Sequence, residues 1–285
     1  MKKEDKRSLI IYTLITFAFT WIFWIAALYM GYKDIPFLRY LNWDFESSSQ
    51  VTRHLIFRIG VYGPLVGSLI VTYLYSGGQG LNSFIKKIFK VKIKAKWYLY
   101  LFLIPLIINL VVVLIGLIIG VNINSFFKSS IPLNYILVFF IYEVLTSGLE
   151  EPGWRGFALE KLQNSFTAEK TGWILGLIWA VWHYPYVISL YITSGFMPMV
   201  LSLAGFSMAI IGQTFIMIWF YNNTKSIFVA ILLHAWLNTS TTFVLGDITI
   251  NNPIMGIIPA LVTWAIVVVL LKVYGGETLT KESVK

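Results

Sequence analysis

Polar side chains that can do chemistry lie within stretches of this sequence that are otherwise apolar. They comprise two acids, an arginine, two histidines and an amide: Glu150, Glu151, Arg155, His183, His234 and Asn238. An ionisable side chain inside a bilayer costs roughly 3 kcal/mol or more, so each is a candidate for function. Cysteine is absent, which excludes disulfides, thiolate metal sites and cysteine nucleophiles.

The acidic motif places its two glutamates in different directions. Glu151 and Arg155 are four residues apart with the acid first, the favourable order for an ion pair on a helix. Glu150 points about 100° away around the helix, so it is free to react while its neighbour is held. Taken alone, the motif is equally consistent with a solvated charge cluster at a cytoplasmic helix end.

Two further pairs repeat the four-residue spacing. His234 and Asn238 share one helix face, and so do Trp179 and His183, so both faces can line one cavity. A carboxylate and an imidazole together can activate a water, while a second imidazole and an amide can donate hydrogen bonds to an oxyanion. The same acid and histidines could instead hold zinc. A single histidine of this kind is more often a packed structural group.

The three motifs resemble those of the intramembrane proteases related to the CAAX prenyl endopeptidase and to bacteriocin-processing and immunity proteins, the CPBP or Abi family. The family pattern is Glu-Glu-x-x-x-Arg, then aromatic-x-x-x-His, then His-x-x-x-Asn or Asp. Here the pattern begins at Glu150, Trp179 and His234, with tryptophan at 179 where phenylalanine is commoner. The resemblance covers residues 132–246, the predicted core of a single transmembrane domain, 1–285.

The resemblance implies a role for each residue. Glu150 and His183 would activate the water, and His234 and Asn238 would stabilise the oxyanion. Glu151, Arg155 and Trp179 would support them. No cofactor is favoured, because an asparagine is a poor zinc ligand; if a metal is present, Zn²⁺ would be bound by Glu150, His183 and His234.

The elements that must position these residues are membrane-spanning helices. Hydrophobic residues make up 58% of the 285 and charged residues 12%, which is far from a soluble composition. Eight stretches are long enough to cross a bilayer. They are residues 9–30, 55–75, 97–120, 132–150, 171–191, 199–221, 226–246 and 253–273. We therefore predict an all-α polytopic membrane protein with the site in the bundle core.

Positive charge is distributed unequally between alternate connections. One side carries 17 lysines and arginines and the other carries four, which predicts that both termini are cytoplasmic. The composition suggests a bacterial plasma membrane. The lysine run at 86–96 would contact anionic lipid, so the net charge of +9 does not indicate nucleic acid. Arg58, inside the second span, is a possible ion-pair partner for Glu143.

The sequence favours a peptidase whose site opens toward the cytoplasm and whose partner is a peptide or a membrane-protein substrate. The main alternative is a non-catalytic immunity or scaffold protein that binds a peptide. A proton-coupled transporter is a third possibility, although no repeated half supports it. The substrate, including whether it is prenylated, and the oligomeric state are not specified by the sequence.

Overall fold

The computed structural model describes residues 1–246, 248 and 253–281, and these residues form helices and connections without a β-strand. The α-helices before the motifs are α1 (Lys3–Tyr29), α2 (Phe37–Leu41), α3 (Ser48–Gly60), α4 (Gly63–Ile88) and α5 (Ala95–Ile118). The remaining α-helices are α6 (Ile136–Leu145), α7 (Glu160–Gln163), α8 (Ala168–Trp182), α9 (Tyr184–Tyr191), α10 (Phe196–Thr224), α11 (Ile227–Val244) and α13 (Pro253–Tyr274). The all-α prediction is confirmed.

Among the described residues, six helices are long and apolar enough to cross a membrane, and two bent helix pairs raise the number to eight if each pair is one span. The bent pairs are α3 with α4, at 45°, and α8 with α9, at 55°. Each predicted stretch coincides with one of these spans, so the polytopic prediction is confirmed. The individual boundaries differ by a few residues at most ends, as expected for patterns read from hydrophobicity.

Side chains from α1 stabilise the bend between α3 and α4. The Thr20 hydroxyl donates to the Gly60 carbonyl at 2.8 Å, and the Trp24 indole donates to the Phe57 carbonyl at 3.0 Å. A bend within a bilayer frees backbone carbonyls that water cannot reach, so they need partners from the protein. Helix α1 supplies these partners and packs along both members of the pair.

The fourth span is longer than predicted. The sequence predicted an end at residue 150, but the helical segment continues from Leu133 to Gln163. Pro152 and Gly153, which follow the predicted end, begin a π-helix, Pro152–Leu159, in which every residue is buried. A side chain at Gly153 would collide with the Pro64 carbonyl and the Tyr12 hydroxyl. The glycine therefore allows this helix to approach α1 and α4 closely.

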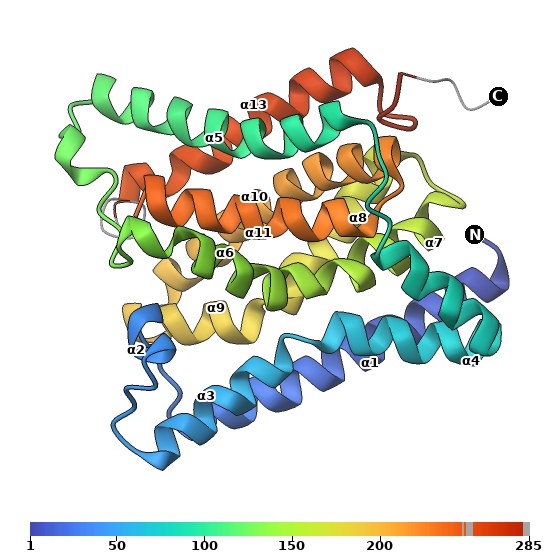
Figure 1. The fold of residues 1–285 in the computed structure, drawn as a ribbon, viewed down its shortest axis with the longest axis horizontal. Helices are drawn as coiled ribbons and strands as arrows, with labels where there is room; N and C mark the ends of the chain where they lie inside the picture. The colour runs from blue at the N-terminus through green and yellow to red at the C-terminus, as the bar shows by residue number, and fades with distance from the viewer. Residues whose placement is uncertain (247, 249–252, 282–285) are drawn as a thin grey trace.

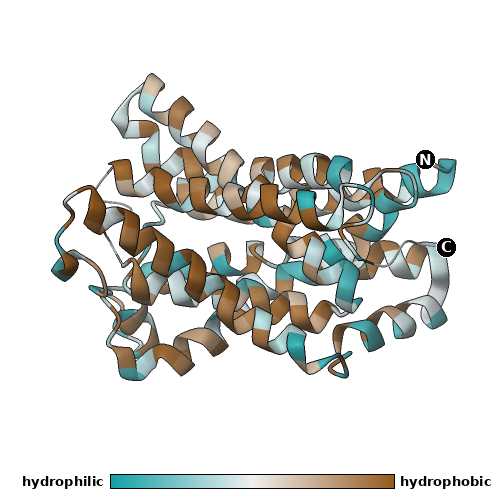
Figure 2. Ribbon diagram, turned by 90° about the horizontal axis from the view of Figure 1, so that it is seen from above, coloured by the Kyte–Doolittle hydropathy of each residue, from teal (hydrophilic) through white to brown (hydrophobic). Residues whose placement is uncertain are grey.

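The helices lie side by side, with both termini at one end of the molecule and α2 at the other (Figure 1). Helix α10 packs against α8 and α13, while α11 packs against α5 and α6. Figure 2 shows apolar residues along most of the helix lengths, and hydrophilic residues gathered around the two termini. The motif-bearing helices therefore lie between the α1, α3 and α4 layer and the α5 and α13 layer (Figure 1).

Candidate active site

An irregular turn positions the two adjacent glutamates. Helix α6 ends at Leu145, Thr146 has φ −109° and ψ −93°, and a short 3₁₀ segment, Ser147–Glu150, leads directly into the π-helix. π-Helical turns are uncommon and occur often at functional sites. Irregular backbone at membrane depth is tolerated where protein surrounds it. The turn brings Glu150 and Glu151 into the centre of a span, not to its end.

Glu150 is buried and is held by two indole groups. Its Oε2 accepts hydrogen bonds from Trp179 Nε1 at 2.9 Å and from Trp154 Nε1 at 3.3 Å. Neither donor is charged, and no cation lies within 4.0 Å of Glu150 among the described residues. The carboxylate is therefore oriented without being neutralised by an ion pair.

His183 shares a cavity with Glu150. This cavity of about 360 Å³ is lined by residues of α1, the segment around α2, α3, α6 and α9, and both Glu150 and His183 contribute to its wall. His183 Nδ1 lies 2.8 Å from the Trp179 carbonyl oxygen. A carbonyl only accepts, so Nδ1 carries hydrogen and Nε2 is an acceptor in the neutral ring. We call Glu150 and His183 the cavity wall pair.

Glu151 belongs to a different environment, which we call the sealed cluster: Glu151, Arg155 and His234. Arg155 and His234 Nδ1 both bind Glu151 Oε1, at 2.9 and 2.8 Å, and all three residues are buried. The predicted Glu151–Arg155 ion pair is confirmed. The Arg155 guanidinium also lies 4.3 Å from the centre of the Trp179 ring. Trp179 therefore contacts both the sealed cluster and, through its indole nitrogen, Glu150.

His234 and Asn238 are placed on one face of α11, but each has a separate partner. His234 packs its ring against Trp179, with 5.3 Å between ring centres. Asn238 Nδ2 donates to Glu143 Oε2 at 2.9 Å and to Ser147 Oγ at 3.2 Å. Among the described residues, the cavity lining includes Glu143 and Ser147 but not His234 or Asn238. The structure thus brings two of the four predicted catalytic residues to the cavity and holds two behind it.

The suggested ion pair between Arg58 and Glu143 is wrong. Glu143 instead accepts from Ser147 Oγ at 2.6 Å and from Asn238. Arg58 donates from Nε to His54 Nε2 at 3.3 Å and lies 5.3 Å from the Tyr142 ring centre. Sequence spacing identified both residues as intramembrane charges, but the competing partner of Glu143, Asn238, lies 95 residues away.

The alternative metal ligands do not converge. In the part of the chain that the structure describes, no group of three or more histidine, aspartate or glutamate side chains is arranged to hold a metal ion. Glu150, His183 and His234 each have a different hydrogen-bond partner, namely Trp179 Nε1, the Trp179 carbonyl and Glu151. That the reaction needs no metal stays a prediction, which chelation can test.

Sequence reasoning placed Trp154 among the aromatic residues near the site but did not identify it as a hydrogen-bond donor to Glu150, and it did not identify Ser147 at all. The Trp154 indole donates to Glu150, and the Ser147 hydroxyl joins Asn238 to Glu143. Trp154 lies four residues after Glu150, so the same spacing that identified the Glu151–Arg155 pair would have found it. Ser147 carried no such signal, because its partner Asn238 comes from another span.

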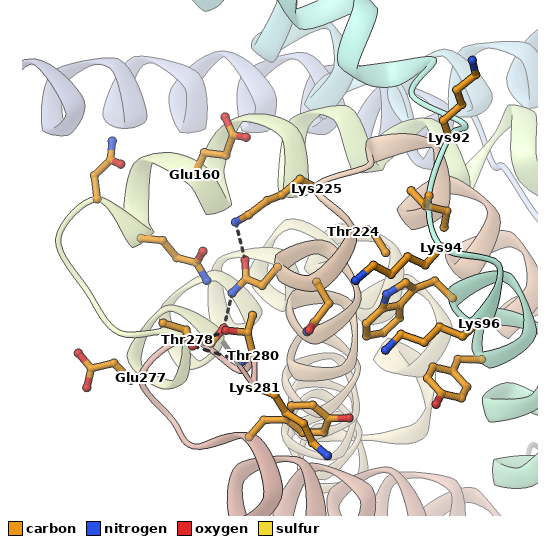
Figure 3. Close-up of a pocket in the computed structure, with 18 of the residues that line it drawn as sticks. Lys92, Lys94, Lys96, Glu160, Thr224, Lys225, Glu277, Thr278, Thr280 and Lys281 are labelled. Carbon is orange, nitrogen blue, oxygen red and sulfur yellow. Dashed lines mark hydrogen bonds between the residues drawn. The ribbon is translucent and has the colours of Figure 1, made fainter. Parts of the chain in front are cut away.

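A second, larger cavity lies at the end of the molecule that holds the termini. Its volume is about 1380 Å³, and its lining includes lysines 92, 94, 96, 225 and 281 (Figure 3). Lys161 also lines it. It contains none of the predicted site residues. Three of these lysines come from the predicted lipid-contacting run, so the run lines a cavity as well as facing the surface.

The small cavity reaches the surface at the opposite end. Asp34, Phe37 and Tyr40 line it, and they lie in and before α2, far from both termini (Figure 1). The sequence predicted cytoplasmic termini and a site that opens toward the cytoplasm. The side on which the termini lie and the side toward which the site opens both stay predictions, and the structure adds that residues in and before α2 line the cavity. The charge distribution could not show this, since it says nothing about where a cavity opens.

The motif-bearing segment matches known proteins. Residues 132–240 match the family model described as type II CAAX prenyl endopeptidase, Rce1-like, and this range contains all seven predicted site residues. The chain is similar to CAAX prenyl protease 2 of Methanococcus maripaludis, with 27% identity over 235 residues that cover 80% of this chain and 82% of the relative. These matches confirm the resemblance predicted from the three motifs, and they indicate that this helical membrane protein is a protease similar to the CAAX prenyl endopeptidases.

Proposed function

We propose that the protein is an intramembrane endopeptidase in which Glu150 and His183 activate a water molecule. The observation that carries the proposal is that these two side chains share the wall of one small cavity inside the helical bundle. Glu150 would take a proton as the water attacks the peptide carbonyl, and would return it to the departing nitrogen. His183 Nε2 would accept a hydrogen bond from the same water and so orient it.

His234 and Asn238 would stabilise the oxyanion in this scheme. His234 already donates from Nδ1 to Glu151, so its ring must carry both protons if Nε2 is also to donate. Asn238 uses its amide nitrogen on Glu143 and Ser147, so it would have to release one of these contacts to reach the substrate. We therefore expect substrate binding to move α11 or the Asn238 side chain, because catalytic hydrogen bonds often reach their working length only when the substrate is bound.

Glu151, Arg155 and Trp179 are positioning residues in the proposal. Glu151 orients His234, and Arg155 holds Glu151. Trp179 offers its carbonyl to His183 and its indole nitrogen to Glu150, so one residue orients both members of the cavity wall pair. Fixed partners of this kind reduce the reorganisation that a reaction requires.

The test is cleavage by Glu150→Gln protein. We expect membranes that carry the wild type to accumulate shortened peptides or proteins that are absent with Glu150→Gln, because glutamine cannot accept the proton. Glu160→Gln is the matched control, since Glu160 lies on the same span but outside the small cavity. Identical products from wild type and Glu150→Gln would reject the mechanism.

Two further arms separate the alternatives. Loss of cleavage on chelation, restored by Zn²⁺, would replace the metal-free scheme with a metal-dependent one. A biological effect that survives both Glu150→Gln and His183→Gln would favour a scaffold or immunity protein that only binds peptides. Prenylated and unprenylated forms of one peptide would show which substrate class is preferred, because the relative is named a CAAX prenyl protease.

We also propose that both termini are cytoplasmic and that the small cavity opens on the other side of the plasma membrane. The cysteine-free chain allows single cysteines to be introduced and labelled directly. A membrane-impermeant maleimide should label Lys33→Cys in intact cells and Lys94→Cys only after lysis. The reverse pattern would place the termini outside and the cavity opening in the cytoplasm.

A further inference from the structure

The larger cavity, at the end of the molecule that holds the termini, carries an excess of positive charge. Among the described residues, its lining contains two glutamates, Glu160 and Glu277. The lining also contains six lysines: Lys92, Lys94, Lys96, Lys161, Lys225 and Lys281. Lys161 pairs with Asp5, but the other five have no carboxylate oxygen within 4.0 Å of Nζ in the described ranges. These five cations therefore border one space without an anionic partner.

The two glutamates do not compensate this charge. Glu160 binds Lys87, which lies outside the lining, and its Oε1 accepts from the Tyr221 hydroxyl at 2.6 Å. In Figure 3, Glu277 lies on one side of the cavity, and Lys94 and Lys96 lie on the other, at the start of α5. The lysines at α5 are thus far from the nearest free carboxylate of the lining.

The backbone of Lys225 is strained. This residue follows α10 directly and has a left-handed conformation, with φ 50° and ψ 38°. Glycine is the usual residue at such a position, because a residue with a side chain adopts it only at a cost in free energy. The Lys225 ammonium lies 3.4 Å from Asn222 Oδ1 and 5.6 Å from the centre of the Tyr221 ring. A lysine where glycine would be less strained points to a use for its side chain.

Hydrogen bonds fix the segments that carry these lysines. The Ser226 hydroxyl donates to the Lys90 carbonyl at 2.6 Å, and Lys90 Nζ donates to the Thr224 carbonyl at 3.1 Å. These contacts hold the lysine run at 86–96 beside the end of α10. The segment after α13 is held as well, because Asn223 Nδ2 donates to the Leu279 carbonyl at 2.9 Å. The cavity is thus preorganised, which lowers the entropy cost of binding a ligand.

The remaining lining is typical of a membrane–water boundary. The cavity lies where α5 begins and α13 ends, and Trp97, Tyr100 and Tyr274 line it there. Tryptophan and tyrosine are enriched at the level of lipid headgroups. Gln163 Nε2, also in the lining, is shielded from solvent and has no hydrogen-bond partner among the described residues. Basic pockets between membrane-spanning helices are known to bind phosphate headgroups.

We propose that this cavity binds an anionic phospholipid through its phosphate. The five lysines would surround the headgroup, and the acyl chains would begin along the aromatic side chains of α5 and α13. At about 1380 Å³ the cavity is larger than most small-molecule sites, which leaves room for a headgroup and the first part of its chains. The inference does not depend on the proposed peptidase function, because the cavity contains none of the proposed catalytic residues.

The experiment measures lipid binding to the purified full-length protein by native mass spectrometry from a neutral detergent. The ligands are phosphatidylglycerol, phosphatidylcholine with the same acyl chains, and glycerol phosphate, which has the headgroup charge but no chains. We expect one saturable phosphatidylglycerol site and at least about tenfold weaker binding of the other two. One lysine near an anionic headgroup corresponds to roughly fivefold in affinity, so the combined variant Lys92→Gln, Lys94→Gln and Lys96→Gln should bind phosphatidylglycerol roughly 100-fold more weakly.

The matched control removes the same charge from outside the cavity. Lys3→Gln, Lys6→Gln and Lys86→Gln change three exposed lysines that do not line it, so this variant should bind like the wild type. An equal loss in both triple variants would overturn the proposal in favour of general surface charge. Equal affinity for phosphatidylglycerol and phosphatidylcholine would also overturn it. Glycerol phosphate that binds as tightly as phosphatidylglycerol would replace the lipid with a soluble phosphate compound.

Lys225→Gly tests the site without a loss of folding. Glycine relieves the left-handed backbone, so the unfolding temperature should equal or exceed that of the wild type. Affinity for phosphatidylglycerol should nevertheless fall roughly fivefold. Added phosphatidylglycerol should raise the unfolding temperature of the wild type, because a ligand of the folded state stabilises it. Wild-type affinity in both Lys225→Gly and the variant at 92, 94 and 96 would reject the site.

Discussion

The cavity wall pair and the sealed cluster come from adjacent glutamates, yet they differ in how charge is compensated. Glu150 receives two neutral indole donors and faces a cavity, while Glu151 receives a guanidinium and an imidazole and is sealed from solvent. Environments that separate two neighbouring carboxylates commonly give them different roles. The difference indicates one group that is free to exchange a proton and one that holds helices together.

The largest expected effect is the loss of activity in His183→Gln. The cavity wall pair would lose its imidazole acceptor, and removal of a positioned acid or base lowers rates by about 10²- to 10⁴-fold. Cleavage of a model peptide by purified protein measures this. The unfolding temperature should change little, because the main packing around the ring, from Trp182 and Phe206, remains. Activity within threefold of the wild type would remove His183 from the mechanism.

The next largest effect is on stability, in Arg155→Met. The substitution leaves Glu151 buried with only His234 as a partner, and breaking a buried ion pair from one side costs about 3–5 kcal/mol. Thermal unfolding in detergent measures the loss. The matched control is Lys87→Met, which breaks the exposed Lys87–Glu160 pair and should cost less than about 1 kcal/mol. Equal unfolding temperatures for the two variants would contradict the expectation that the buried ion pair contributes more to stability than the exposed one.

Much of this contrast could be predicted from spacing along single helices. The Glu151–Arg155 ion pair was predicted correctly because both partners lie on one helical turn and their order favours pairing. The polytopic all-α architecture also followed from hydrophobicity alone, with six to eight candidate spans among the described residues. Both predictions depend on interactions within about 20 consecutive residues, which a single sequence contains.

The rest depended on contacts between distant segments. The partner of His234 is 83 residues away, and that of Asn238 is 95 residues away, so their spacing on α11 could not reveal which groups they meet. The predicted end of the fourth span was also wrong: the helical segment continues through Pro152 and Gly153, and the close approach of α1 and α4 at Gly153 is a contact between distant segments. The opening of the cavity also depends on α2, which the sequence pattern did not connect to the site.

Trp179→Phe tests the residue that contacts both regions, with a smaller effect. Phenylalanine keeps a ring beneath Arg155 but removes the indole hydrogen that binds Glu150 Oε2. Loss of one hydrogen bond to a charged group corresponds to roughly tenfold or more in rate. We expect kcat to fall by about tenfold while the unfolding temperature stays near that of the wild type. A large loss of stability with normal kcat would mean that Trp179 serves the sealed cluster alone.

The smallest expected effect is in Glu143→Gln, a substitution in the cavity lining at the residue that binds Asn238 of α11. Glutamine retains an oxygen that can accept from Ser147 and Asn238 but loses the charge, so we expect a stability loss of about 1 kcal/mol and a rate within tenfold of the wild type. Ser147→Ala is the companion variant, because it removes the hydroxyl and leaves the carboxylate. If Glu143→Gln folded normally but abolished cleavage, the charge of Glu143 would be required for the reaction. The catalytic group in the cavity would then contain two carboxylates, Glu143 and Glu150, together with His183.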